Sequence, residues 1–313
     1  MTYACATWLV WARRQSSSIP SSSGSSRWKG SVRDLNRASD QGGVERDADG
    51  GASGATGHDR RVDLPLLEDD LAAEGVIEPS RVTPTVNMPA CAVVCFFGEV
   101  VQLIAGRPGS RQVTVLSSEA GLNPVWEIEM SGRRLAVFQP GMGAPLAAAF
   151  LEEVIAMGCR RLVVCGGAGA LLPELVLGHA VVVASAIRDE GTSYHYLPPS
   201  RVVDADPHAV ATLVDTLDAA GVAHLVGRTW TTDAFYRETR ARVDRRVAEG
   251  AVLVEMEAAA LLAVAQYRKV MLGQVLLAGD SLAGACWDDR GWTSAHAARE
   301  KLFWLAADAA LAL

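Results

Sequence analysis

The sequence predicts an α/β fold in which a single domain carries a central mixed β-sheet flanked by helices. Short apolar runs with strand character alternate along the chain with segments of helical spacing, which favours this class. Hydrophobic residues make up 50% of the 313 residues, enough for a sizeable core. Glycine and polar residues follow several of the apolar runs, at the strand ends where α/β sheets bind ligands.

The first 62 residues differ in composition from the rest. Residues 21–26 and 47–51 are rich in Ser, Gly and charge, and such segments bury too little apolar surface to offset the entropy of ordering the backbone. We therefore expect residues 1–62 to be a disordered or fold-less extension and residues 63–313 to form the folded domain.

The first half of this domain alternates strands with a helix. Residues 92–97 form a short apolar run that predicts a buried strand, and residues 113–116 and 135–138 are β-rich runs bounded by turn residues. Residues 146–157 have helical spacing and end at Gly158, which suits a C-cap.

The second half repeats the alternation. Apolar runs predict strands at residues 161–165, 180–184 and 275–278. Helical spacing predicts helices at residues 207–220, 257–268 and 301–313, the first of them ending near Gly221.

Composition argues against several classes of protein. The net charge of −7 is spread along the chain without a basic cluster interleaved with aromatics, which disfavours nucleic-acid binding. No apolar run reaches the roughly eighteen residues that span a bilayer, and residues 1–14 lack the charge order of a signal peptide. The six cysteines form no C-x-x-C pair, which predicts buried thiols in a reducing, cytoplasmic compartment and no metal site.

Glu255-Met256-Glu257 is the most informative segment because it places two carboxylates at the start of an apolar helix. A buried carboxylate must find hydrogen-bond donors, and the vicinal hydroxyls of a sugar are such donors. The alternative is an acidic helix start on an ordinary core helix, favoured by the helix dipole.

Residues 166–169, Gly-Gly-Ala-Gly, follow a predicted strand. Backbone N–H groups at glycines can approach an anion or a sugar closely, although a tight strand-to-helix turn is the alternative. The segment does not match G-x-G-x-x-G, and no Walker lysine follows it, so neither a dinucleotide site nor a nucleoside triphosphate site is predicted.

Together with residues 141–145 and 232–236, these segments resemble the nucleoside phosphorylase superfamily, in its uridine phosphorylase and hexameric purine nucleoside phosphorylase branch. The resemblance covers roughly residues 91–313. It implies a nucleoside phosphorylase-like catalytic domain that cleaves the N-glycosidic bond of a purine nucleoside or uridine. Phosphate would be the co-substrate, ribose 1-phosphate a product, no cofactor would be needed, and the assembly would be a homo-oligomer.

The resemblance also assigns roles to particular residues. Asp280 matches the aspartate that protonates N7 of a departing purine, a general-acid role that suits an oxocarbenium-like transition state; a helix N-cap is the alternative. Phe235 matches the aromatic residue that stacks on the base. Arg240 and Arg242 flank the two positions that read uracil in the family, which are Thr239 and Ala241 here. The ribose would contact Glu255, Met256, Glu257 and His195.

The expected phosphate site departs from the family pattern. The family's usual Arg and Ser/Thr positions around the glycine segment are Val164 and Gly167, and its Gly-Asp-x-x-Arg segment is absent around residues 96–99. The remaining candidates for holding the anion are Gly143, Gly166, Gly167, Arg188 and Arg237. Two alternatives therefore stay open, a hydrolytic nucleosidase that uses water and an inactive homologue that binds nucleosides, and the sequence names neither the base nor the sugar.

Overall fold

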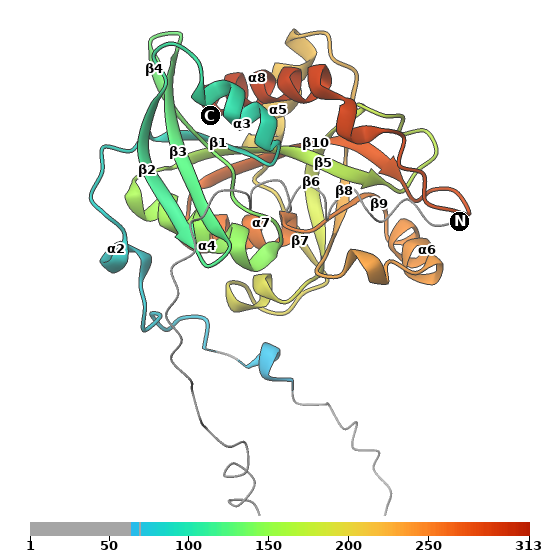
Figure 1. Cartoon of the computed structure of the whole chain (residues 1–313). Helices are drawn as coiled ribbons and strands as arrows, with labels where there is room; N and C mark the ends of the chain where they lie inside the picture. The colour runs from blue at the N-terminus through green and yellow to red at the C-terminus, as the bar shows by residue number, and fades with distance from the viewer. Residues whose placement is uncertain (1–63, 69) are drawn as a thin grey trace, which may run out of the picture. The chain divides into compact units, whose positions relative to one another are not determined.

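The computed structural model describes residues 64–68 and 70–313 (Figure 1). The extension expected at residues 1–62 lies outside the described residues. The described chain opens with two short helical turns, η1 (Pro65–Leu67) and α2 (Pro79–Val82). Within this part of the chain, no helix is both long enough and apolar enough to cross a membrane.

One mixed ten-stranded sheet organises the domain and confirms the predicted α/β class. At one end, β2, β3 and β4 pair antiparallel, and β4 then runs parallel to β1, which is itself parallel to β5. The strands are β1 (Cys91–Cys95), β2 (Arg111–Ser118), β3 (Gly121–Met130), β4 (Arg133–Phe138), β5 (Arg161–Ala170), β6 (Ala180–Asp189), β7 (Val202–Asp204), β8 (His224–Thr232), β9 (Ala251–Glu255) and β10 (Met271–Ser281).

Five of these strands close into a ring. β5 pairs with β10, β10 with β6, β6 with β8, β8 with β9, and β9 returns to β5. β1 pairs with β5 as far as Cys165, and β9 pairs with it at Gly169 and Ala170. Among the described strands, residues 166–168 therefore have a partner only on the β10 side, and this open edge lies between the ends of β1 and β9.

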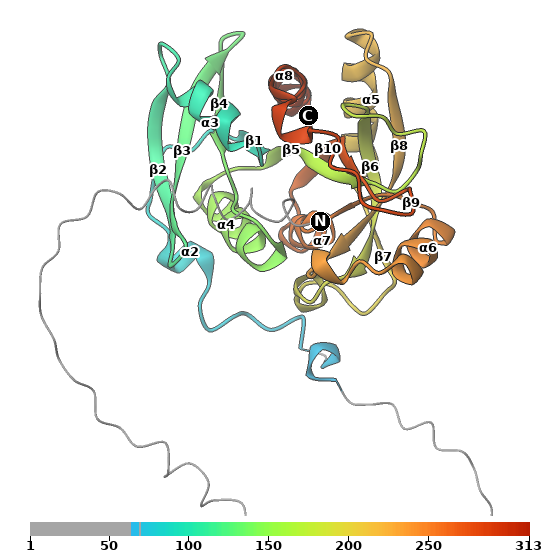
Figure 2. The same cartoon turned by 45° about the vertical axis from the view of Figure 1, so that its right-hand side comes forward.

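Helices cover both faces of the sheet (Figures 1 and 2). α4 and α7 pack on one apolar cluster, and α3, α5 and α8 pack on another. Alternation along β1 divides the two clusters, because Ala92 and Val94 belong to the first and Val93 to the second. The helices are α3 (Gly98–Ala105), α4 (Ala144–Met157), α5 (Pro207–Ala219), α6 (Arg240–Ala248), α7 (Ala258–Arg268) and α8 (His296–Ala312), with short turns η2 (Thr192–His195), η3 (Phe235–Arg237) and η4 (Trp292–Ser294).

The glycine segment at residues 166–169 differs from the alternative of a tight turn, because it continues strand β5. Its glycines leave space that neighbouring side chains occupy. A Cβ at Gly166 would lie 3.2 Å from Phe96 Cβ, and one at Gly169 would lie 2.8 Å from Leu282 Cδ1. Close packing, rather than a reversal of the chain, accounts for these glycines.

The cysteine prediction is correct for most of the described thiols. Cys91, Cys95, Cys159 and Cys165 are buried and free, whereas Cys286 is exposed. Burial raises the pKa of the Cys159 thiol to about 12, so this thiol stays protonated and behaves as a small apolar group.

Candidate functional site

The Glu-Met-Glu segment joins the end of β9 to the start of α7. Glu255 accepts hydrogen bonds from the backbone N–H groups of Glu257 at 2.7 Å and Ala258 at 2.6 Å, and from the Thr231 hydroxyl at 2.6 Å. The first N–H groups of a helix have no partner within the helix, so Glu255 supplies one. Glu255 therefore mainly stabilises the junction between β9 and α7.

The second carboxylate, Glu257, is held by a turn from elsewhere in the chain. Its Oε1 accepts the Gly143 N–H at 2.6 Å, and Gly143 is the N-cap of α4. Gly141 and Gly143 have φ of 80° and 89°, which glycine adopts without strain. A Cβ at Gly141 would lie 2.5 Å from Leu146 Cδ2, so the turn itself requires glycine.

Burial makes these carboxylates reluctant to ionise. Glu255 and Glu257 are 8% and 7% exposed. Burial raises the pKa of Glu257, and the charge of Glu255 adds to the rise. Burial also raises the pKa of Glu255, against the lowering effect of its hydrogen bonds, and the nearby Glu190 adds to the rise. We call Glu190, Glu255 and Glu257 the β9 cluster; its crowded acceptors favour a ligand rich in hydroxyl donors.

On the Glu190 side of this cluster, the buried Arg188 side chain holds a loop. Arg188 is 4% exposed and donates to the Ser193 hydroxyl, the Pro198 carbonyl and the Ser200 hydroxyl at 2.7–2.8 Å. Ser193 in turn donates to Glu190. Because Arg188 is bonded into this loop, its placement does not support the phosphate-binding role predicted for it.

A second group of polar side chains lies at the end of β10. Asp280 accepts the indole N–H of Trp287 at 2.6 Å, and burial raises its pKa. Burial, together with the charge of Asp280, raises the pKa of Glu238 to about 8. We call Glu238, Asp280 and Trp287 the β10 cluster; a strand end that holds a carboxyl proton near neutral pH can perform general-acid chemistry.

The segment 233–238 borders both clusters. At its start, Asp233 accepts the Gly191 N–H at 2.9 Å, and its charge contributes to the raised pKa of Glu257. At its end, Glu238 interacts with Asp280. Phe235 lies between these two positions in the chain, is 41% exposed and packs against Tyr236 with ring centroids 4.1 Å apart. This placement suits the base-stacking role predicted for Phe235.

The other predicted residues are less closely tied to these clusters. Arg240 donates to the carbonyls of Leu282 and Gly284 at 2.7 and 2.6 Å, so it anchors the loop that follows Asp280. Near the start of α6, Arg237 is exposed and Arg242 is half-buried. His195 is exposed at the end of η2, which packs beside α7.

The aromatic environment of the glycine segment bears on the predicted anion site. Phe96 packs on the Gly166 side, and a Cβ at Gly167 would lie 3.6 Å from the Trp292 ring and 3.7 Å from the Phe97 ring. The open backbone edge at Gly166 and Gly167 can still receive a ligand. Its surroundings are mainly aromatic, and Arg299, which lines a small pocket with Gly167, is already bonded to Glu99 and the Trp292 carbonyl.

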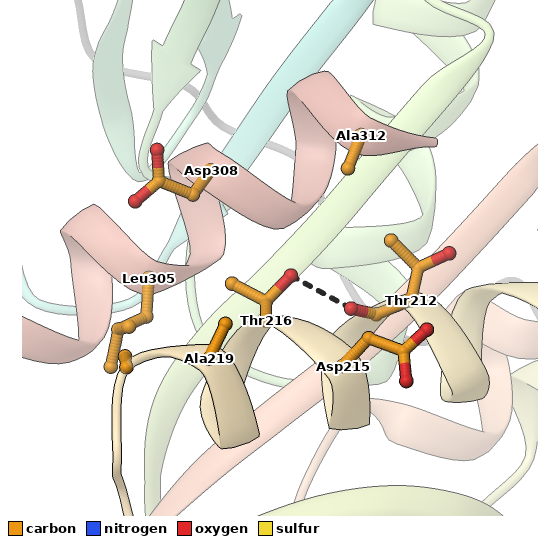
Figure 3. A pocket seen from close by; sticks show the side chains of 8 residues that line it. Thr212, Asp215, Thr216, Ala219, Leu305, Asp308 and Ala312 are labelled. Carbon is orange, nitrogen blue, oxygen red and sulfur yellow. Dashed lines mark hydrogen bonds between the residues drawn. The ribbon is translucent and has the colours of Figure 1, made fainter.

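A groove that is lined by none of the cluster residues lies between α5 and α8 (Figure 3). This groove of about 630 Å³ is lined by threonine, aspartate, alanine and leucine side chains, and the Thr216 hydroxyl is satisfied by the Thr212 carbonyl of its own helix. The described residues contain no group of three or more His, Cys, Asp or Glu side chains placed to hold a metal ion.

The sequence did not identify three residues of the two clusters as candidates for the site. Glu190 stands in a segment recognised only as dense in polar groups, and Glu238 stands three residues after the predicted stacking aromatic. Trp287 gave no signal at all, because its partner Asp280 is fixed by the path of the loop between them.

The chain is similar to known proteins in sequence and in fold. The family model described as "Phosphorylase superfamily" matches residues 90–309. Uridine phosphorylase of Escherichia coli is 27% identical over 164 residues, and guanosine phosphorylase of Halorubrum lacusprofundi is 31% identical over 154 residues. The alignments cover 48% and 49% of this chain, which spans just under two thirds of these relatives, 65% and 64% of their lengths. The crystal structure of uridine phosphorylase from Vibrio fischeri superimposes with a TM-score of 0.62 at 19% identity, over 72% of this chain and 94% of that one.

Proposed function

Because this chain belongs to the phosphorylase superfamily, we propose that it cleaves the N-glycosidic bond of a nucleoside, by phosphorolysis to a free base and ribose 1-phosphate. The observation that carries the proposal is the pair of clusters at the ends of β9 and β10, two strands that both pair with the end of β5, with Phe235 on the segment that borders both clusters. A hydroxyl-rich sugar matches the acceptors of the β9 cluster, and a nitrogenous base matches the protonatable β10 cluster.

In this reaction Glu257 accepts hydrogen bonds from the ribose hydroxyls, with Met256 packed at the sugar. Asp280 donates a proton to a ring nitrogen of the base as the bond between C1′ and the base breaks. The bonding electron pair leaves with the base, and the phosphate oxygen forms the new bond to C1′. A purine fits best because its N7 can accept the proton. The relatives named for uridine and guanosine support both base classes as test substrates.

Hydrolysis is the second candidate, and the packing around the glycine segment favours it. Phosphate next to C1′ needs cationic partners, yet Val164 and Gly167 replace the expected polar groups and Phe96 packs against Gly166. Arg188 and Arg240 are bonded to other parts of the chain. Water as the nucleophile needs none of these cations.

Further features of this function are also proposals. The reaction needs no cofactor or metal beyond phosphate as co-substrate. The free, mostly buried cysteines suit a reducing, cytoplasmic location. The family resemblance supports a homo-oligomer, which light scattering on the full chain would measure.

The test is base release from inosine, guanosine, adenosine and uridine, each with and without phosphate, followed by identification of the sugar product. Phosphorolysis predicts ribose 1-phosphate and a strict phosphate requirement, whereas hydrolysis predicts free ribose in both conditions. Nucleoside binding without any base release would instead identify a non-catalytic homologue. Asp280→Asn serves as the matched inactive control.

A further inference from the structure

The indole of Trp287 donates a hydrogen bond to the Asp280 carboxyl. Its Nε1 lies 2.6 Å from Asp280 Oδ2, while Asp280 Oδ1 lies on the side of Gly169, 3.6 Å from where a Cβ there would stand. The two oxygens of this carboxyl therefore face different surroundings. Trp287 is 52% exposed, so burial of its ring does not explain its position.

The loop that carries Trp287 is anchored at several points, and these contacts fix the orientation of the indole. Ser281 and Asp288 exchange two backbone hydrogen bonds of 2.7 and 3.0 Å across the base of the loop. Arg240 donates to the carbonyls of Leu282 and Gly284, and Arg290 donates to the Leu175 carbonyl at 2.6 Å. Trp287 is thus half-exposed, lies on an anchored loop and contacts Asp280 through its indole N–H. This placement indicates that the indole orients Asp280.

We propose that Trp287 is a positioning residue for Asp280: its indole N–H holds Oδ2 as an acceptor and leaves Oδ1 as the oxygen that carries the proton given to the base. The inference rests on the proposed cleavage reaction. The O–H bond at Oδ1 breaks, a ring nitrogen of the base gains the proton, and the electrons of the broken C1′–N bond leave with the base. Trp287 itself neither gives nor takes a proton.

The charged groups around Asp280 determine the direction of the expected pH effect. Glu238 faces it from the segment before α6, and Asp289 and Arg290 face it from its own loop. The Trp287 N–H lowers the pKa of Asp280 against the rise caused by burial, because it stabilises the ionised carboxylate. Removing this donor should raise the pKa of the acid, so activity should persist to higher pH.

The experiment compares Trp287→Phe with Trp304→Phe in the full chain. Trp304 also donates its indole N–H to a carboxylate, Glu300 at 3.4 Å on α8, and serves as the matched control. In Trp287→Phe we expect the alkaline limb of the kcat–pH profile to move up by about one pH unit, since a hydrogen bond to a charged group has that order of effect. Below that limb kcat should fall while KM changes little. Trp304→Phe should match the wild type, and an unmoved alkaline limb in Trp287→Phe overturns the proposal.

A second measurement separates this inference from the proposed function. The indole ¹H–¹⁵N signal of Trp287 is identified by its loss in Trp287→Phe. In the wild type its shift should titrate with Asp280, and in Asp280→Asn that titration should vanish. A flat signal in the wild type overturns the proposal even if the protein cleaves nucleosides. A titrating signal in a protein that releases no base leaves the hydrogen bond established, and refutes the proposed reaction instead.

Discussion

Both clusters contain carboxyls whose pKa burial raises, Glu255 and Glu257 in the β9 cluster and Glu238 and Asp280 in the β10 cluster, but these carboxyls are held in different ways. In the β9 cluster, most donors to the carboxylates are backbone N–H groups: those of Glu257 and Ala258 bind Glu255, and that of Gly143 binds Glu257, while the Thr231 hydroxyl adds a side-chain donor to Glu255. In the β10 cluster, the indole of Trp287, a side chain on a loop, holds Asp280.

The difference indicates which part of a substrate each cluster can recognise. Backbone donors at helix starts are fixed by the fold itself, so the β9 cluster suits a group common to all substrates, such as ribose. Side chains on loops change readily between relatives, so the β10 cluster suits the part that varies, the base. The half-exposed rings of Phe235 and Trp287 belong to this variable side.

The largest expected effect tests the chemical role of the β10 cluster. Asp280→Asn should lower kcat by roughly 10²–10⁴-fold, because a positioned proton donor contributes about that much. Substrate affinity should change less, since the amide keeps the shape of the carboxyl. Purine nucleosides should also be cleaved faster than uridine by the wild type. If uridine is the better substrate and Asp280→Asn is nearly as active, both the purine preference and the acid role fail, and Arg240 and Arg242 become the candidate base readers.

A smaller loss should follow in the β9 cluster. Glu257→Ala removes an acceptor for the ribose hydroxyls, and losing a charge-assisted hydrogen bond costs about 1.5–3 kcal/mol, or roughly 10–150-fold in kcat/KM. The Gly143 N–H also loses its partner, so melting must be measured on the same sample to separate misfolding from lost binding. Near-wild-type kinetics in a folded variant would remove Glu257 from the site and leave the β9 cluster a purely structural feature.

The sequence predicted the fold class, which the structure confirms, and the pair of carboxylates at the end of β9, whose role in a site stays a prediction. Short apolar runs marked β1 and β5, and paired acids in an apolar context marked Glu255 and Glu257. It did not predict β3, which contains Pro124 and Asn123, residues depleted in strands. Asn123 and Pro124 lie in β3 because they pair with Leu116 and Val115 of β2, whereas the pairing with β4 begins only at Trp126.

Local sequence patterns do not show which partner each long polar side chain binds. Arg188 is a chemically suitable phosphate ligand, but its hydrogen bonds go to residues 193–200 within the same loop. Likewise, the Glu255 carboxylate is oriented by Thr231 from another strand. Such partners lie far apart in the sequence or depend on the path of a loop, so residue type and spacing do not reveal them.

The two clusters should also respond oppositely when an acid becomes its amide. Glu255→Gln places an amide donor against the Thr231 hydroxyl, whose oxygen already accepts the Ala259 N–H at 2.9 Å. We expect a loss of about 1–3 kcal/mol in the free energy of unfolding, the usual cost of an unsatisfied buried polar group. Urea denaturation measures it, and a variant as stable as the wild type would show that the helix start does not depend on this acceptor.

Glu238→Gln is the matched change in the β10 cluster, and there we expect a small gain in stability that depends on pH. The pKa of Glu238 is raised to about 8, first by burial and then by the charge of Asp280. Between the ordinary glutamate pKa, about 4.5, and this value, the folded protein holds a proton that the unfolded chain has lost. Folding stability therefore falls as pH rises through that window, and the neutral amide removes this loss.

The melting temperature of Glu238→Gln should accordingly equal that of the wild type near pH 5 and exceed it at pH 8. Glu255→Gln gives the contrast at pH 8. There Glu255, whose pKa is raised to about 7, is ionised and accepts three hydrogen bonds that its amide cannot all accept, so this variant should melt below the wild type. An equal offset for Glu238→Gln at pH 5 and pH 8 would mean that Glu238 titrates normally. The contrast between the clusters would then rest on hydrogen bonding alone, with backbone donors on the β9 side and the Trp287 indole on the β10 side.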